Sequence, residues 1–131
     1  GQPLSYRSIE KGIGWSHDSK SLAFRVKLKK VDADVAAIVV ADLDTPDKLD
    51  ILYTAVRLHS DVSWHPDGNQ ILFSGLDSSA GTPQMFIVKR TDPEKLIPVP
   101  GQPRNWRIID CDWSPDGQRI AFTAEQPQEK P

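Results

Sequence analysis

Apolar and polar positions along the chain follow a pattern that returns every 49 residues. The segments WSHDSKSLAF, WHPDGNQILF and WSPDGQRIAF begin at Trp15, Trp64 and Trp113 and align without an insertion or a deletion. Each segment places a polar turn between two short apolar stretches. A fixed period near 50 residues is typical of a repeat architecture. The other positions shared by all three segments are the turn aspartates Asp18, Asp67 and Asp116 and the aromatic residues Phe24, Phe73 and Phe122.

Each repeat predicts four short strands. In the second repeat they cover residues 61–64, 70–74, 84–89 and 95–99, and in the first repeat 12–15, 21–26, 36–42 and 51–58. The turn at 65–68 reads HPDG, in which proline fixes φ and Gly68 accepts a positive φ. The stretch AAIVVA at 36–41 is apolar on both faces, as in a fully buried strand. Because no helical period intervenes, each repeat is interpreted as one antiparallel blade of a β-propeller.

The whole chain is therefore predicted to be one all-β partial propeller of about two and a half repeats, covering roughly 12–60, 61–109 and 110–131. Residues 4–9 align with 53–58 at the end of the fourth strand, so we expect residues 1–11 to hold a detached fourth strand that completes a terminal blade, in a dimer the terminal blade of the other copy. Closed propellers typically have four to eight blades, and exposed sheet edges favour aggregation. We expect two copies to pair head-to-tail into a six-bladed ring. The alternative is that the missing blades come from another polypeptide or were removed.

Composition narrows the function classes. The 131 residues include 16 Lys and Arg and 18 Asp and Glu, for a net charge of −2, so there is no general attraction to nucleic acid or to an anionic membrane. No apolar run reaches the roughly 20 residues of a membrane helix, and no signal-peptide pattern opens the sequence. The single cysteine, Cys111, shares its place with Ile13 and Val62, which predicts a small buried side chain.

The segments at 113–122 (WSPDGQRIAF) and 64–73 (WHPDGNQILF), with IVVADLD at 38–44, resemble the WD-like propeller repeat of the TolB family. That repeat also occurs in propellers of the tricorn protease and of prolyl-oligopeptidase-type enzymes. The first segment departs from the pattern, with His17 in place of proline and Ser19 in place of glycine, and we expect its turn to be looser. The resemblance implies a propeller fold and says little about function, because such propellers serve many roles.

One aromatic residue stands outside the repeat. Trp106 corresponds to Arg57 one period earlier, and it lies between two arginines in a connection between blades. Tryptophan and arginine are enriched at binding hot spots, and the connections near 27–34, 76–84 and 104–107 should lie at the same end of the ring. A solvated rim without a specific partner is the alternative. The partner-binding candidates are Arg104, Asn105, Trp106, Arg107 and Asp77.

Other polar groups have plainer interpretations. Asp61, Asp110 and Asp112 are candidates to line the central channel. The three histidines are interpreted as turn or strand-end residues, and Asp42, Asp44 and Asp47 as a solvated turn, because neither set has a metal-site spacing. The glycine- and serine-containing loop at 75–81 lacks the G-x-S-x-G nucleophile elbow. We expect no metal, no cofactor and no catalytic residue.

The sequence thus predicts a non-enzymatic scaffold that binds a protein or peptide. The alternative is the substrate-gating propeller of a serine peptidase whose catalytic domain lies elsewhere. Resemblance to TolB implies the periplasm or cell envelope, with a cytoplasmic setting as the alternative.

Overall fold

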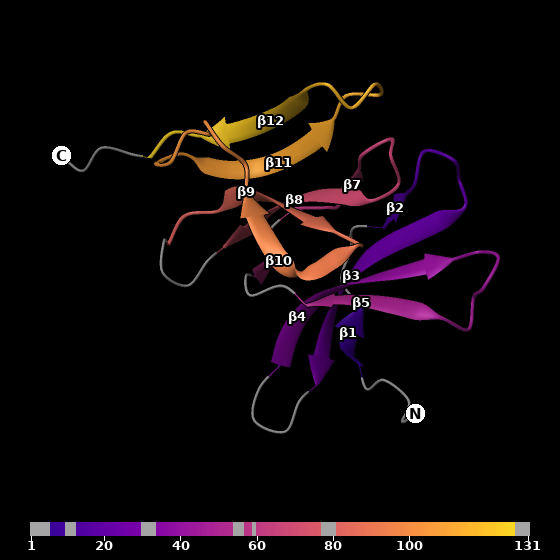
Figure 1. The fold of residues 1–131 in the computed structure, drawn as a ribbon. Coiled ribbons are helices and arrows are strands. Elements are labelled where there is room, and N and C mark those ends of the chain that lie inside the picture. The colour runs from indigo at the N-terminus through magenta and orange to yellow at the C-terminus, as the bar shows by residue number, and fades with distance from the viewer. Residues whose placement is uncertain are drawn as a thin grey trace.

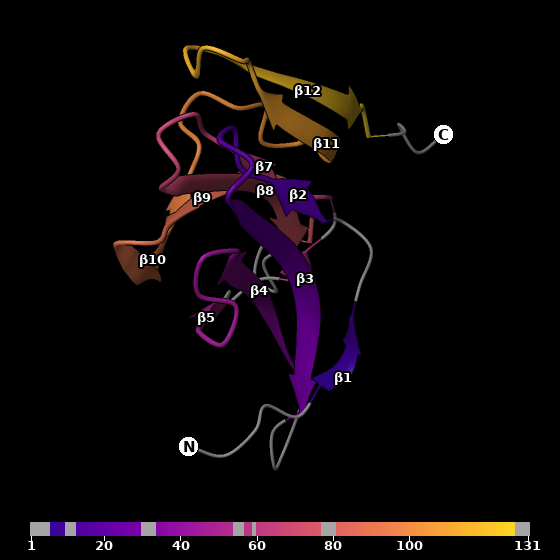
Figure 2. The ribbon, with the colours of Figure 1, turned by 90° about the vertical axis from the view of Figure 1, so that its right-hand side faces the viewer.

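The computed structural model of the chain describes residues 6–9, 13–29, 34–53, 57–58, 60–76 and 81–127. These residues form strands and turns, and no helix occurs among them. The strands build three antiparallel sheets, and the middle sheet lies between the other two (Figures 1 and 2). The expected all-β partial propeller is confirmed, and we name the sheets blade 1, blade 2 and blade 3 in chain order.

The first two blades are built alike. In each, two short inner strands pair with one long strand, and two further strands follow outward. Blade 1 consists of β1 (Tyr6–Ile9), β2 (Gly14–Trp15), β3 (Ser21–Lys29), β4 (Asp34–Asp42) and β5 (Leu49–Tyr53). Blade 2 consists of β6 (Arg57–Leu58), β7 (Ser63–Trp64), β8 (Gln70–Leu76), β9 (Gln84–Lys89) and β10 (Asp92–Pro98). Blade 3 contains only β11 (Arg107–Trp113) and β12 (Ile120–Glu125).

The position of β1 differs from the expected one. Ile9 lies opposite Val26 of β3, just as Leu58 lies opposite Gly75 one period later. Within this chain β1 is therefore half of the first strand of its own blade, not a fourth strand left for another blade. The predicted strand at 51–58 likewise divides into β5 and β6. Both differences have one cause. The long strands β3 and β8 each pair along their length with two short segments, and in the sequence these two segments look like unrelated strands.

The turn of the first repeat is as tight as the other two, against our expectation. Ser19 adopts a φ of 61°, close to the 72° of Gly68 and the 73° of Gly117. Its main-chain N–H donates to the carbonyl of Ser16 over 3.0 Å, the bond that Gly68 makes to His65. The side chain of Asp18 holds the turn by accepting the Ser16 hydroxyl and the N–H of Lys20. A side chain in this left-handed region costs about 1–2 kcal/mol, and the turn bonds offset that cost.

The main core lies between blades 1 and 2. Trp64, Ile71, Val88 and Leu96 lie in one row across the four strands of blade 2 and pack against blade 1. The apolar stretch of β4 is buried on both faces, as its sequence predicts, since residues 37–40 are at most 1% exposed. A second core joins blades 2 and 3 through Leu72, Met85, Ile108 and Cys111. The three blades are thus fastened by side chains that alternate between the two faces of each sheet.

Candidate functional site

The connection between β10 and β11 is held in place by two glutamines. Gln102 accepts the main-chain N–H of Met85 at Oε1 over 2.6 Å, and its Nε2 donates to the carbonyls of Met85 and Val99. Gln84 donates from Nε2 to the carbonyls of Pro103 and Trp106, over 3.4 and 3.2 Å. These contacts fasten the connection to β9 and bring residues 83–84 and 103–108 together. The expectation that 76–84 and 104–107 share one end of the ring holds for their described residues.

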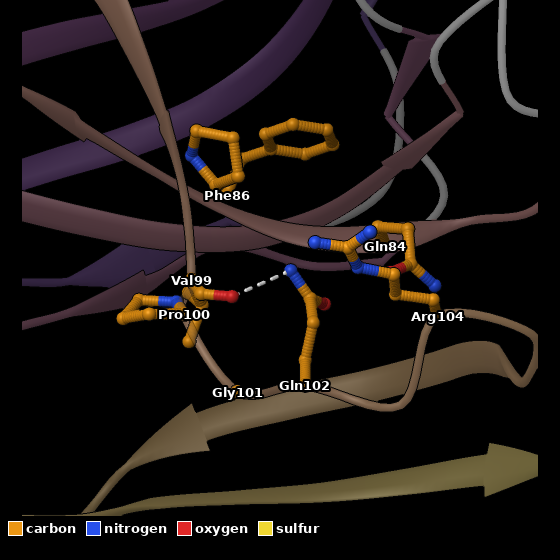
Figure 3. A pocket seen from close by; sticks show the side chains of 8 residues that line it. Gln84, Phe86, Val99, Pro100, Gly101, Gln102 and Arg104 are labelled. Carbon is orange, nitrogen blue, oxygen red and sulfur yellow. Dashed lines mark hydrogen bonds between the residues drawn. The ribbon is translucent and has the colours of Figure 1, made fainter.

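A cavity of about 390 Å³ opens beside this connection. Figure 3 shows Phe86 on one side of it and the chain from Val99 to Gln102 on the other, with Arg104 nearby. The prolines of this segment restrict its backbone, and Gly101 makes the turn with a φ of 75°. The wall is mainly apolar with an exposed guanidinium close to it. The lining residues are Gln84, Phe86, Pro98, Val99, Pro100, Gly101, Gln102 and Arg104.

The predicted partner-binding residues lie next to this cavity. Trp106 is 39% exposed, an unusual state for so large an apolar side chain. Arg104, Asn105 and Arg107 around it are exposed as well. Among the described residues no carboxylate forms an ion pair with either arginine. Asp77 lies outside the described residues. The connection therefore places the Arg104 guanidinium at the apolar cavity and exposes an indole and a second cation within the next three residues.

The residues predicted to line the central channel lie away from this cavity. Asp110 and Asp112 are exposed and, with Ala121 and Thr123 opposite them on β12, line a shallow depression of about 190 Å³. Because both strands contribute, this depression lies on the open face of the blade 3 sheet. Asp112 also accepts the hydroxyl of Ser63 over 2.5 Å, which ties it to blade 2. Asp61 is exposed at the entry to β7.

The repeated aromatic residues differ in their surroundings. Trp64 is 2% exposed and donates its indole N–H to the carbonyl of Gly14 over 3.0 Å, across the interface between blades 1 and 2. Trp113 is partly buried, and its indole N–H is buried without a partner among the described residues. Trp15 is 55% exposed. The phenylalanines differ likewise, from fully buried Phe73 through partly buried Phe24 to Phe122, which is 43% exposed.

Two histidines join neighbouring blades, a role that sequence reasoning missed. Nε2 of His17 lies 2.9 Å from the carbonyl of Trp64, and Nε2 of His65 lies 3.1 Å from the carbonyl of Gly117. Since a carbonyl only accepts, each Nε2 carries the proton. Nδ1 of His65 in turn accepts the N–H of Asp67, so this ring is neutral and its 3.3 Å approach to the Asp67 carboxylate is not an ion pair. His59 lies outside the described residues.

Sequence reasoning also missed an ion-pair link between blades 1 and 2. The guanidinium of Arg90 binds both carboxylate oxygens of Asp42, over 3.2 and 2.9 Å, and one of Asp50 over 2.6 Å. Hydrogen bonds from Arg90 and from the Ser21 hydroxyl lower the pKa of Asp42. Asp42 was expected in a solvated turn with Asp44 and Asp47. The signal that could have found the link is a charged residue directly after an apolar strand, at the place where the preceding repeat has Leu43, since the N–H of Leu43 binds the carbonyl of Lys20 as the N–H of Arg90 binds that of Asn69.

Cys111 is buried, as its repeat position predicts, and its thiol lies 3.9 Å from the Ser60 hydroxyl. Burial raises the pKa of this thiol to about 12, although the Ser60 contact opposes the shift. A thiol with that pKa is a poor nucleophile at neutral pH. In the described part of the chain, no group of three or more histidine, cysteine or carboxylate side chains is placed to hold a metal ion. Nor does that part contain a helix long and apolar enough to cross a membrane.

Comparison with known proteins gives matches in structure alone. No protein-family model matches the sequence, and neither does any curated protein. TolB from Acinetobacter baumannii superposes with a TM-score of 0.63 at 19% identity, over 89% of this chain and 27% of that chain. The AtxE2 isopeptidase with Astexin3-dC4 bound gives 0.63 at 16% identity, over 86% of this chain and 20% of that one. A prolyl endopeptidase gives 0.61 at 21% identity, over 91% and 19%.

These matches cover nearly all of this chain but only 19–27% of each solved structure. Identities of 21% or less establish the fold and nothing finer. The chain therefore has the fold of a TolB-like, peptidase-type β-propeller, of which it forms two full blades and the first half of a third.

Proposed function

We propose that this chain is a non-enzymatic part of a propeller scaffold that binds an extended segment of a protein or peptide. The observation that carries the proposal is that the connection lining the 390 Å³ cavity, which includes Arg104, also exposes Trp106 and Arg107. An apolar wall, an indole and two cations are suited to a segment with both apolar and acidic side chains. The glutamine contacts hold the surface rigid before binding, which lowers the entropic cost of association.

Three observations support a binding role over catalysis. The two described histidines have their Nε2 atoms committed to carbonyls of a neighbouring blade, and the Cys111 thiol is kept protonated by burial. The proposed surface also lies on connections between strands, where propellers and other rigid scaffolds commonly bind. A chromogenic prolyl p-nitroanilide substrate tests this part of the proposal. We expect no turnover above that of a heat-denatured sample, and turnover that scales with enzyme concentration would refute it.

Binding is tested with peptide arrays that carry acidic, neutral and basic ten-residue sequences matched in apolar content. We expect the acidic apolar peptides to bind and to bind at least tenfold more weakly to Trp106→Ala and Arg104→Ala. Trp15→Ser, which changes an exposed tryptophan of blade 1, is the matched control and should bind like the wild type. Equal binding of acidic and basic peptides, or no effect of Trp106→Ala, would refute the proposed surface.

A second candidate is favoured by the two peptidase structures among the matches. In that case the chain is part of a propeller that screens substrates for a catalytic domain. Sequencing of the gene around this segment decides between the two, because a G-x-S-x-G elbow in an α/β-hydrolase pattern would favour the peptidase. If the chain is the TolB-like binding scaffold of the first proposal, we place the protein in the cell envelope. In both cases the open faces of blades 1 and 3 need covering, by a second copy or by further blades.

A further inference from the structure

The outer face of blade 1 is an apolar surface without a neighbour among the described residues. Trp15, Leu22, Ala41 and Leu49 lie side by side across its four strands. Trp15 and Leu49 are 55% and 39% exposed, and Ile13 next to them is 65% exposed. In the neighbouring row Val39 is completely buried between Phe24 and Ile51, so the exposed apolar surface is confined to the end of the sheet around Trp15 and Leu49. We call this surface the Trp15 face.

Blade 2 shows what such a face does when it is covered. Trp64 and Ile71 of its row stand one period of 49 residues after Trp15 and Leu22, and Val88 and Leu96 stand 47 residues after Ala41 and Leu49. That row packs on the side of blade 1 formed by Gly14, Ala23 and Val40, and Trp64 is then only 2% exposed. Gly14 allows this close approach, because a Cβ there would lie 2.9 Å from the carbonyl oxygen of Val62.

The open face of blade 3 corresponds to the covered side of blade 1. Asp112 and Ala121 lie opposite each other there, and they stand 98 residues, two periods, after Gly14 and Ala23. Together with Asp110, Thr123 and neighbouring atoms they line the 190 Å³ depression. Ala121 is exposed, whereas Ala23 is completely buried beneath blade 2. We call this surface the Ala121 face.

We propose that the Trp15 face of one copy docks on the Ala121 face of a second copy, blade against blade as within the chain. Because Asp112 stands where blade 1 has Gly14, the second copy lies further from this strand than blade 2 lies from Gly14. The Trp15 indole then enters the depression, as the indole of Trp64 packs over Gly14. Its N–H, which can only donate, meets two acceptors at Asp112, the main-chain carbonyl and the carboxylate. Each copy carries both faces, so a twofold axis generates two such contacts and closes the pair.

The Ala121 face of a second copy is favoured over other occupants because the repeat itself supplies the complementary shape. An unrelated partner would have to reproduce the twist and spacing of the paired strands β11 and β12 to cover Trp15 and Leu22 as a blade of the repeat does. The proposed function already allows a second copy to cover the open faces, and the inference names the residues that would form this contact. It does not depend on peptide binding near Trp106. It predicts head-to-tail pairing between two different faces, which a symmetric contact of one Trp15 face with another would not produce.

Light scattering during size-exclusion chromatography, over a hundredfold range of concentration, provides the test. We expect the wild type to approach twice the 14.6 kDa mass of the chain. Trp15→Ser and Ala121→Arg should each weaken association at least tenfold while leaving the circular dichroism spectrum unchanged, because both side chains are exposed. Trp106→Ser, an equally drastic change at an exposed tryptophan outside both faces, should associate like the wild type.

Mixing the two deficient variants tests the direction of pairing. The Ala121→Arg variant retains an intact Trp15 face, and the Trp15→Ser variant retains an intact Ala121 face. The mixture should therefore form a dimer through one intact contact, at concentrations at which each variant alone is monomeric.

A wild type that remains monomeric throughout, or a dimer unaffected by Ala121→Arg, would overturn the inference. If the wild type forms the dimer but binds none of the peptides, the result counts only against the proposed function.

Discussion

Two glycines at the same place in consecutive repeats provide a measurement of the contact between blades 2 and 3. Gly68 and Gly117 have φ values of 72° and 73°, so an alanine at either site adopts the same unfavourable backbone conformation. A Cβ at 68 would meet nothing within 4 Å, whereas one at 117 would lie 2.5 Å from Nε2 of His65 and 2.9 Å from Cδ of Pro66. Any difference between the two substitutions therefore reports on the neighbouring blade.

The expected costs follow from these contacts. Gly68→Ala should lower the free energy of unfolding by about 1 kcal/mol, the cost of a side chain in the left-handed region. Gly117→Ala should cost about 3 kcal/mol, because His65 must also move away. It then loses its hydrogen bond to Gly117, about 1 kcal/mol. It also loses its edge-on contact with Trp113, whose ring centre lies 4.7 Å away, worth about 0.5–1.5 kcal/mol.

Urea unfolding followed by tryptophan fluorescence and far-ultraviolet circular dichroism measures both variants. In a His65→Ala background the additional cost of Gly117→Ala should shrink, because only the contact with Pro66 remains. Equal costs for the two glycine substitutions in the wild-type background would refute the reasoning. They would mean that the turn of blade 3 does not lie against His65.

Three further predictions use the same unfolding measurement or simple chemistry. Ser19→Gly should raise the free energy of unfolding by about 0.5–1 kcal/mol, because glycine adopts the φ of 61° without the strain of a side chain; a loss of stability would show that the turn is not strained. Asp42→Asn should cost about 1 kcal/mol at pH 7, an amount suited to a partly exposed ion pair with Arg90. Because the pKa of Asp42 is lowered from 3.8, the wild type should lose this advantage as the pH falls below about 3.8, and an advantage that persists at pH 2 would contradict the assignment. Cys111 should react with iodoacetamide at pH 8 far more slowly in the folded protein than in urea. Since its pKa is raised from 9.0 to about 12, its contribution to stability should be present below pH 9 and lost between pH 9 and 12, relative to Cys111→Val; a reactive thiol in the folded protein would contradict the burial.

The blades themselves could be predicted because their determinants are local. The turn residues of each repeat fix where a hairpin closes, and β9 has the predicted bounds while β8 begins at the predicted residue. Burial of β4 on both faces follows from an uninterrupted apolar stretch. The interrupted first strand was harder, because its halves are separated by several residues and joined only by their shared partner. The segment at 57–58 follows closely after β5 in the sequence, so sequence reasoning joined the two as one strand at 51–58.

The environment of the repeated residues could not be predicted, because it depends on the presence of a neighbour. Trp15 and Trp64 open nearly identical segments, yet one is 55% exposed and the other 2%. The difference arises because Trp64 has blade 1 beside it and, among the described residues, nothing occupies that place for Trp15. A motif therefore predicts what a residue does for its own blade, and the arrangement of blades decides whether the residue is buried.

The residues that depart from the repeat make the specific contacts between blades. His17 stands where the other segments have proline, and it binds the carbonyl of Trp64. Arg90 takes the place of Leu43 and joins blade 2 to Asp42 and Asp50 of blade 1. At the position of Gly14 the second repeat has Ser63, whose hydroxyl oxygen accepts the main-chain N–H of Trp113.

The exchange of Gly14 for Ser63 coincides with a difference in the hydrogen bonding of the indole N–H groups. With Gly14 in the first interface the indole N–H of Trp64 finds a carbonyl, whereas with Ser63 in the second the indole N–H of Trp113 has no partner among the described residues. Trp106 is a further departure, and it lies at the proposed binding surface. In an array of similar blades the shared residues build each blade, and the departures decide how one blade recognises the next.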